Sequence, residues 1–303
     1  MRMARPIVAA APSGAPAVSA VIELLKPITW FPPMWAYACG LASSGATADG
    51  RWTDIVLGVL LAGPLICGTS QAVNDWYDRH VDAINEPNRP IPSGRVPGQW
   101  GLYIAIAWTL LSVAVAAAIG PLALAAGSVG LLLAWAYSAP PLRLKRNGWV
   151  GNAAVGACYE GLPWYTGAAV MTGLAPGIEI VTLAVLYSVG AHGIMTLNDF
   201  KSIEGDLRMG IASLPARLGV ARAARVACVV MAVPQAIVVA AMLWWGYAAW
   251  ALPVALLLGA QLVLMRRFLA DPAGRATWYS AAGVGLYVLG MLTCAFALRL
   301  GSA

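Results

Sequence analysis

The sequence predicts an all-α, polytopic membrane protein with nine transmembrane helices, and three observations lead to this fold class. Hydrophobic residues make up 60% of the 303 positions and charged residues only 11%, whereas a typical soluble domain carries about 25% charged residues. The mean hydropathy is +0.73, and the apolar runs are long enough to cross a lipid bilayer. Polar segments rich in Pro, Gly and Asn separate these runs, as expected for connections outside the lipid.

One membrane domain is expected over residues 21–303, after a flexible N-terminal tail over residues 1–20. The tail is rich in Ala and Pro, and its prolines leave too short an apolar core for a signal peptide. The expected spans lie near 28–48, 55–73, 101–119, 122–139, 149–171, 178–197, 226–245, 247–265 and 278–298. Pro32 and Pro33 should distort the first span. Gly120 and Pro121 should close a tight turn between the third and fourth spans.

The distribution of basic residues predicts the orientation of the spans. With the N-terminus in the cytoplasm, all but Arg51 and Arg299 of the 19 Lys and Arg residues fall on the cytoplasmic side. Basic loops favour that side of a membrane. The net charge of +6 therefore follows from topology, and we expect no nucleic-acid partner.

An acidic motif closes the second span. It reads NDWYDRHVD, runs from Asn74 to Asp82 and follows a long uncharged apolar run. On an α-helix, Asp75, Asp78 and Asp82 project within one sector of roughly 60°. We therefore expect a single acidic helix face at the cytoplasmic end of this span.

A second acidic motif closes the sixth span. It reads NDFKSIEGD, runs from Asn198 to Asp206, and repeats both the Asn-Asp opening and the seven-residue step between aspartates. The two motifs lie four predicted spans apart, which predicts a duplicated four-helix unit plus one extra helix. Parallel repeats of this kind tend to place a binding site at their interface.

Two acidic clusters at one membrane surface favour metal and phosphate chemistry. Mg²⁺ is commonly held by one or two carboxylates together with waters and substrate phosphates. The adjoining loops are basic, and Arg and Lys bind phosphate oxygens. The alternative, that the acids are merely solvated helix ends, explains one cluster better than two with equal spacing. We expect a lipid-linked diphosphate whose head lies at the clusters and whose chain lies among the helices.

The motifs also resemble those of a known family. NDWYDRHVD and NDFKSIEGD resemble the two Asp-rich motifs of the UbiA superfamily, nine-helix intramembrane prenyltransferases that use Mg²⁺ and a prenyl diphosphate. The phrases INEPNRPIPSGR, YSAPPLRLKRNG, YEGLPW and GAHGIMTLNDFKSIEGD are similar to its chlorophyll and bacteriochlorophyll synthase branch, above all to enzymes of photosynthetic bacteria. The similarity extends from about Leu24 to Leu298.

The resemblance implies roles for individual residues. It implies that the acids of both motifs are catalytic Mg²⁺ ligands, namely Asp75, Asp78, Asp82, Asp199 and Asp206. It also implies that the asparagines of the motifs and nearby basic side chains bind the diphosphate, namely Asn74, Arg89, Arg143, Lys145, Asn198 and Lys201. The second motif reads D-x6-D where D-x3-D is usual in the superfamily, which leaves the role of Glu204 open.

The resemblance also implies a reaction. A geranylgeranyl or phytyl group would pass from its diphosphate to the propionate of bacteriochlorophyllide, forming an ester and releasing diphosphate. That carboxylate is ionised at neutral pH, since carboxylic acids titrate at about pH 4, so no strong base is needed. The implied location is the inner or intracytoplasmic membrane of a bacterium, with a cytoplasmic active site and with other pigment-pathway enzymes as partners.

Two ionisable residues fall within predicted spans. Glu160 lies near the middle of the fifth span, and His192 lies about two turns before Asp199 on the sixth. Intramembrane ionisable residues usually have a function. In one interpretation His192 contacts the magnesium or a carbonyl of the pigment, and Glu160 shapes the same pocket. In the other, the two residues pair with each other or join helices by hydrogen bonds.

Three other functions compete with this interpretation. A transporter would place its acids near the bilayer midplane, whereas most of these lie at one surface. A pigment-binding structural protein would need several histidines, and the chain has only His80 and His192. The nearest alternative is a UbiA-type prenyltransferase that acts on an aromatic quinone precursor, since it would share every aspartate.

Overall fold

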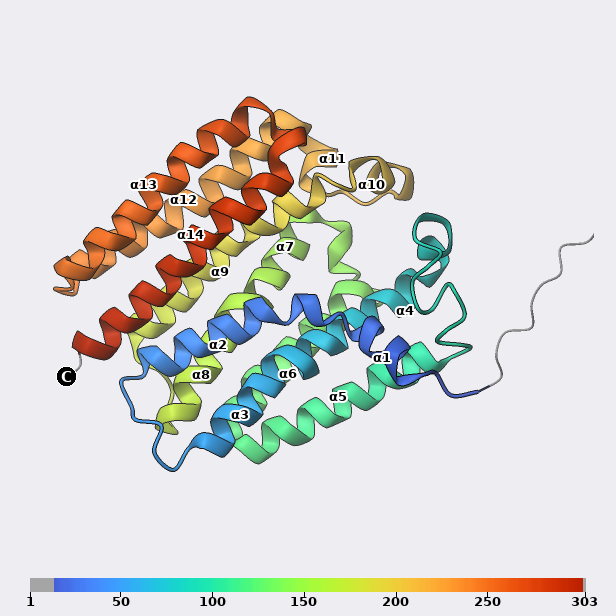
Figure 1. The fold of residues 1–303 in the computed structure, drawn as a ribbon, viewed down its shortest axis with the longest axis horizontal. Helices are drawn as coiled ribbons and strands as arrows, with labels where there is room; N and C mark the ends of the chain where they lie inside the picture. Colours follow the sequence, from blue (N-terminus) through green and yellow to red (C-terminus); the bar gives the residue numbers. More distant parts are fainter. Residues whose placement is uncertain (1–13, 302–303) are drawn as a thin grey trace, which may run out of the picture.

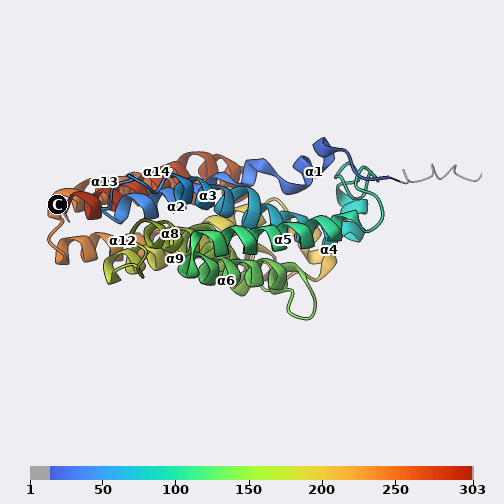
Figure 2. The ribbon, with the colours of Figure 1, turned by 90° about the horizontal axis from the view of Figure 1, so that it is seen from below.

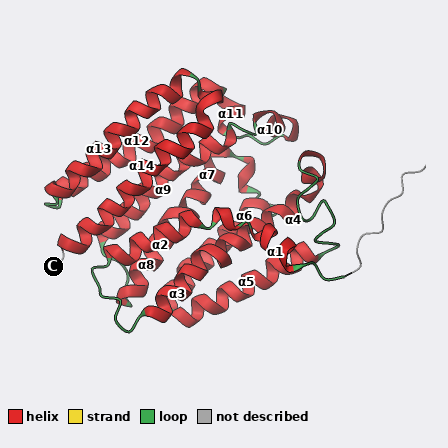
Figure 3. Cartoon of the chain, viewed as in Figure 1, coloured by secondary structure: helices red, strands yellow, loops and turns green. Residues whose placement is uncertain are grey.

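The computed structural model describes residues 14–301, which form a bundle of α-helices (Figure 1). Over this range the only β-type pairing is an isolated bridge between Asn147 and Ala212. Figure 3 shows loops connecting the helices mainly at the two ends of the bundle. The predicted all-α class is confirmed for the described residues.

The first half of the chain places the first acidic motif on a long helical segment. α3 (Trp52–Leu60), the π-helical η2 (Leu61–Cys67) and α4 (Gly68–Asn85) follow one another without a loop. Pro64 in η2 lacks a backbone N–H, which interrupts the regular α-helical hydrogen bonding. The neighbouring elements are α1 (Val18–Leu25), η1 (Pro27–Thr29), α2 (Phe31–Ser43), α5 (Trp100–Ile119) and α6 (Pro121–Ser138).

The second half repeats this feature at η4 (Ala157–Gly161), a π-helical turn between α7 (Gly148–Gly156) and α8 (Leu162–Thr172). Pro163 again removes a backbone donor at this point. The remaining elements are η3 (Leu144–Arg146), α9 (Ile178–Asp199), α10 (Ile203–Met209), α11 (Leu214–Leu218), α12 (Val220–Trp244), α13 (Ala248–Ala270) and α14 (Pro272–Gly301).

Among the described residues, seven helical segments are long and apolar enough to cross a membrane, so the predicted count of nine is not confirmed. The two predicted spans that fall short are 28–48 and 149–171. The first is interrupted at Trp30, so that α2 is only 13 residues long. The second is divided by η4 and contains the polar residues Asn152 and Glu160.

Two predicted boundaries also need correction. The span predicted at 55–73 is part of a helical segment that continues to Asn85, because the acidic motif is itself helical. The predicted tail over residues 1–20 overlaps α1, which begins at Val18. Residues 1–13 of that tail lie outside the described range.

Both acidic motifs lie at the same end of the bundle. In Figure 1 the end of α4 and the helices α10 and α11 are on the right, opposite the C-terminus. The turned view in Figure 2 shows a layered bundle, with α3, α13 and α14 above α6, α9 and α12. The order of packing is similar in the two halves, since α4, α5 and α6 contact in sequence, as do α9, α12 and α13. This order agrees with a duplicated unit in which α14 is the extra helix, packed on α13 and α2.

Small residues bring α2 and α8 into close contact near the centre. A Cβ on Gly40 would collide with the carbonyl of Trp164, and one on Gly167 with the carbonyl of Tyr37. Such contacts between small residues are typical of membrane helix packing. The buried rings of Trp164 and Tyr187 stack beside this contact, with centroids 5.6 Å apart. The contact fixes the position of η4, which precedes α8.

Candidate active site

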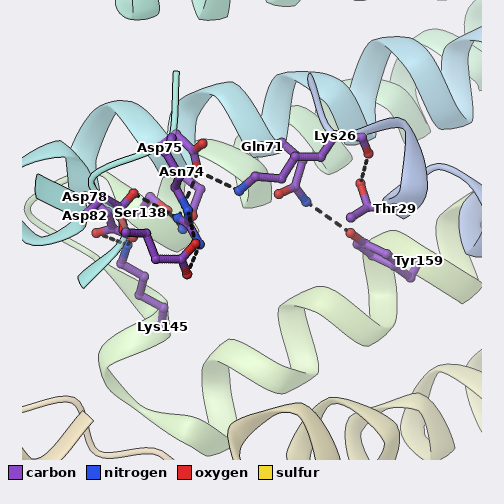
Figure 4. A network of polar contacts seen from close by, with 12 residues as sticks. Lys26, Thr29, Gln71, Asn74, Asp75, Asp78, Asp82, Ser138, Lys145 and Tyr159 are labelled. Atoms are coloured by element: carbon purple, nitrogen blue, oxygen red, sulfur yellow. Dashed lines mark hydrogen bonds and ion pairs between the residues drawn. The ribbon is translucent and has the colours of Figure 1, made fainter. Parts of the chain in front are cut away.

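The first acidic motif forms an inward face of α4, as the sequence predicts. Asp75 and Asp82 are buried and Asp78 is half-buried. Helical spacing explains this arrangement, because positions three, four and seven residues apart share a face. Figure 4 shows Asn74 on the same helix, where its Nδ2 donates to Ser138 Oγ at 3.1 Å.

Basic side chains compensate the two buried carboxylates. Lys26, in the turn after α1, donates from Nζ to Asp75 Oδ1 at 2.7 Å (Figure 4). Arg89 donates from Nη1 to Asp82 Oδ2 at 2.9 Å and lies 3.5 Å from Asp75 Oδ1. A buried carboxylate is costly unless it is paired, so these cations account for the burial of the motif. Asp75 Oδ2 is buried without a hydrogen-bond partner and keeps its lone pairs available.

The third carboxylate of the motif meets the loop between α6 and α7. Lys145 Nζ lies 2.5 Å from both Asp78 oxygens, and Arg143 Nη2 lies 3.9 Å from Asp78 Oδ1. Burial lowers the pKa of Lys145, while the negative charge of Asp78 opposes this effect. A cavity of about 240 Å³ opens here, lined by Asp78, Arg143, Lys145, Val81, Arg146 and Ile211.

The second acidic motif does not form one continuous helix. α9 ends at Asp199, and α10 begins at Ile203 after a short turn. Asp199 Oδ2 accepts from Asn152 Nδ2 at 3.3 Å, and the buried Asp206 accepts from Ser202 Oγ at 2.9 Å. Within the described part of the chain, neither carboxylate is paired with a Lys or Arg. The second motif therefore repeats the spacing of the first but does not form a single helix face.

Three other residues of this motif are exposed. Glu204 points to solvent and pairs with Arg208 at 2.6 Å, one turn along α10. Asn198 donates from Nδ2 to Met195 Sδ at 3.8 Å, and Lys201 is exposed in the turn between the helices. Glu204 lies after the break between α9 and α10, on the exposed side of α10.

The segment after the second motif lies against the basic loop. Ala212 N donates to Arg146 O, and Gly148 N donates to Ala212 O, each at 3.0 Å. Ile211, next to this bridge, lines the same cavity as Asp78. These backbone bonds therefore place the chain of the second motif beside the basic loop that faces the first.

Tyr137 on α6 gives a further sign that the motifs converge. It lies close enough to Asp78, Asp199 and Asp206 for an electrostatic interaction with all three. Even so, no group of three His, Cys, Asp or Glu side chains in residues 14–301 is arranged as a ready metal site. The acids of the two motifs thus lie near one another, and those of the first motif are paired with cations.

The two predicted pigment contacts line different cavities. His192 Nε2 lies 3.1 Å from Trp149 O, which joins α9 to α7, and its Nδ1 is buried without a partner. It lines a cavity of about 640 Å³ beside α8 and α12. Glu160 lines another cavity, of about 290 Å³, on the side of α2 and α14. The described contacts include no pairing between Glu160 and His192.

Sequence reasoning missed several residues of this region. Lys26 follows a short helix whose only acid, Glu23, pairs with Arg95, and nothing local indicates that Lys26 contacts Asp75. Asn152 could have been found, because an amide in a predicted apolar span needs a partner. Arg146 lies in the basic loop already noted, while Tyr137 and Ser138 precede that loop at the end of α6.

Comparisons with known proteins agree with these features. A model of the UbiA prenyltransferase family matches residues 29–281, which include both acidic motifs. The chain is 56% identical over 288 residues to the bacteriochlorophyll synthase 33 kDa chain of Cereibacter sphaeroides, with 95% of each protein covered. It is 54% identical over 287 residues to the protein of that name from Rhodobacter capsulatus, with 94% of each covered.

A solved structure supports the fold independently. The bundle is similar to a UbiA homolog from Archaeoglobus fulgidus bound to DMAPP and Mg²⁺, with a TM-score of 0.67 and 22% identity. The match covers 93% of this chain and 99% of that one. Family model, full-length relatives and fold agree, and the chain belongs to the UbiA prenyltransferase family.

Proposed function

We propose that this prenyltransferase esterifies the propionate of bacteriochlorophyllide with a geranylgeranyl or phytyl group taken from its diphosphate. The observation that carries the proposal is the 56% identity to a bacteriochlorophyll synthase chain over 95% of both proteins. The match extends over almost the whole chain, and so well beyond the two acidic motifs.

Mg²⁺ fits the donor set of the two motifs. Carboxylate oxygens are the ligands that Mg²⁺ prefers, and Asp75 Oδ2 is buried without another partner. A relative in fold is bound to DMAPP and Mg²⁺. The proposed ligands are the acids of both motifs, Asp75, Asp78, Asp82, Asp199 and Asp206. When bound, the metal supplies positive charge close to the diphosphate.

The diphosphate is proposed to bind at the cavity beside Asp78. Arg143, Lys145 and Arg146 line this cavity, and each can donate to phosphate oxygens. Further donors at this end of the bundle are the amides and cations Asn74, Arg89, Asn198 and Lys201. As the bond between the prenyl carbon and oxygen breaks, the leaving diphosphate takes the electron pair. Fixed positive groups stabilise the charge that develops there.

The acceptor needs orientation and not activation. Its propionate is already an anion at neutral pH. One propionate oxygen forms a bond to the allylic carbon as the diphosphate leaves, so the ester forms without any proton transfer. Holding both reactants at one end of the bundle supplies much of the rate acceleration.

The proposed location is the inner or intracytoplasmic membrane of a bacterium. The N-terminus and both acidic motifs would face the cytoplasm, because nearly all basic residues would then lie on that side. In that orientation a water-soluble diphosphate head and a lipid-soluble tail can approach the site together. Other enzymes of the pigment pathway are proposed as partners that supply the acceptor.

The test is an assay of the purified protein in detergent with Mg²⁺ and geranylgeranyl diphosphate. Bacteriochlorophyllide a is offered in one reaction and 4-hydroxybenzoate in another. We expect an esterified pigment that is no longer formed when EDTA is added. Prenylation of 4-hydroxybenzoate alone would indicate that the acceptor is an aromatic quinone precursor and not bacteriochlorophyllide. A parallel reaction with phytyl diphosphate measures the preference for the tail.

A further inference from the structure

Glu160 is a buried acid that the proposed chemistry at the acidic motifs does not use. It is only 4% exposed and lies in the π-helical turn η4. Among the described residues it has no hydrogen bond and no ion pair, and its Oε2 is fully covered. The buried carboxylates of the first motif, by contrast, are paired with Lys26 and Arg89. π-helical turns often occur at functional sites.

The cavity of about 290 Å³ connects Glu160 with the second acidic motif. Asn198, from that motif, lines it together with Glu160. Most of its walls are apolar and come from α2, α9 and α14, with Phe31, Pro32, Ile194, Met195, Val284 and Val288. Its other polar side chain, Tyr159, is already engaged, because its hydroxyl accepts from Gln71 Nε2 at 3.4 Å. Glu160 is thus the unengaged polar group of an apolar cavity that reaches the proposed reaction site.

The surroundings determine what Glu160 can recognise. An ionised carboxylate with neither a cation nor a hydrogen bond is strongly unfavourable in an apolar cavity, so the carboxyl is protonated. A protonated carboxyl has one O–H donor that needs an acceptor. The prenyl chain is a hydrocarbon and offers none. The diphosphate is assigned to the cavity beside Asp78, which shares no lining residue with this one, so the polar partner is assigned to the acceptor substrate.

We propose that Glu160 positions the acceptor by donating a hydrogen bond to the ketone on the edge of the tetrapyrrole that carries the propionate. This inference rests on the proposed function. A cavity of about 290 Å³ is at the lower limit for small-molecule sites, so it admits one edge of the macrocycle and not the whole ring. With that edge between Asn198 and Glu160, the propionate lies towards the second motif.

Two substitutions separate hydrogen bonding from charge and packing. Glu160→Leu removes the polar group at similar volume, and Glu160→Gln keeps a donor that cannot ionise. Val284→Ala is the matched control, because it alters the same cavity wall without changing its polarity. The full-length protein is assayed in detergent with Mg²⁺ and geranylgeranyl diphosphate, and KM is measured for each substrate separately.

We expect Glu160→Leu to raise the acceptor KM about tenfold, the size of effect that follows from losing one buried hydrogen bond. Glu160→Gln should stay within about threefold of wild type, since its amide also donates. The donor KM should not change in either variant. Val284→Ala should affect all acceptors to the same extent.

Two acceptor analogues identify the group that Glu160 contacts. In one, the ring ketone of bacteriochlorophyllide a is replaced by a methylene, and in the other the acetyl group on the opposite side is replaced by a vinyl. With the ketone-free analogue, wild type and Glu160→Leu should have equal acceptor KM values. With the vinyl analogue, the full difference should remain.

Several results would overturn the proposal. Equal increases in the acceptor KM of Glu160→Gln and Glu160→Leu would indicate that the carboxylate is ionised. A change in the donor KM would indicate that Glu160 contacts the prenyl chain. A wild-type KM in Glu160→Leu, or an undiminished loss with the ketone-free analogue, would remove its role in recognition. If wild type esterifies no tetrapyrrole at all, the proposed function fails first, and this inference fails with it.

Discussion

The two acidic motifs share a sequence pattern but differ in what surrounds them. Each carboxylate of the first lies within 3 Å of a cationic nitrogen, in the pairs Asp75–Lys26, Asp78–Lys145 and Asp82–Arg89. In the second, Asp199 and Asp206 accept hydrogen bonds from the neutral side chains of Asn152 and Ser202. The first motif is therefore balanced in charge within the protein, and the second is not.

Because of this difference, we expect the two motifs to contribute unequally to the binding of metal and of diphosphate. A cation placed near the second motif gains attraction that no resident lysine or arginine already supplies, and charge interactions strengthen where water is excluded. The first motif is instead surrounded by donors that suit phosphate oxygens. We infer that the second motif contributes more of the attraction for metal, and the surroundings of the first more of the attraction for diphosphate.

The largest expected effect is the loss of turnover when either motif is broken. Asp75→Ala and Asp199→Ala should each lower kcat by about 10²- to 10³-fold or more, because neither motif alone can stabilise the charge that develops on the diphosphate. The assay is esterification with saturating Mg²⁺, and size-exclusion chromatography checks the fold. Glu179→Ala is the control, since Glu179 contacts Tyr247 outside the motifs. Activity near wild type in Asp199→Ala would remove the second motif from the site.

The two motifs should also differ in how much each contributes to the stability of the protein without metal. In EDTA, Asp75→Asn should destabilise the protein by about 1–3 kcal/mol, because it leaves Lys26 without its partner. Asp199→Asn should leave the stability unchanged or increase it, since an amide removes an uncompensated charge and still accepts from Asn152. The measurement is the thermal unfolding of each variant in detergent. Equal destabilisation by both substitutions would show that the charge difference between the motifs has no energetic consequence.

A smaller effect is expected at the basic loop. Lys145→Ala should raise the KM for the prenyl diphosphate about tenfold, because a charge-assisted contact to a phosphate is lost. The acceptor KM should stay unchanged. Arg217→Ala, which removes an exposed positive charge on α11, controls for the net charge of the protein. An unchanged donor KM in Lys145→Ala would contradict the assignment of the diphosphate to the cavity beside Asp78.

The sequence predicts the first motif better than the second for a physical reason. Asp75, Asp78 and Asp82 lie on one regular helix, so helical spacing alone determines their common face. Asp199 and Asp206 have the same seven-residue spacing, but a turn separates them. Phe200, in that turn, packs against Phe268 from a distant part of the chain, with ring centroids 5.9 Å apart. Spacing in the sequence does not carry this information.

Long-range partners were equally hidden from the sequence. Lys26 and Asp75 are 49 positions apart, and Asn152 and Asp199 are 47 apart. Nothing in the composition of either segment determines such pairs. The apolar spans were easier to predict, because hydropathy is a local property, although the interruptions at Trp30 and η4 reduced two of them. Local patterns therefore predicted the elements, and packing determined how the site is assembled.

The smallest expected effect concerns Glu204, which the motif pattern left open. Its side chain is 82% exposed and its only described partner is Arg208, one turn away on α10. Exposed pairs of this kind contribute little, so Glu204→Ala should change kcat and both KM values less than about twofold. Asp206→Ala, two positions further and buried, is the matched comparison and should lose most of its activity. The measurement is the Mg²⁺ dependence of esterification for both variants. A much higher Mg²⁺ requirement in Glu204→Ala would contradict this prediction. It would mean that α10 reorients when metal and substrate bind, so that the difference between the motifs exists only in the protein without its ligands.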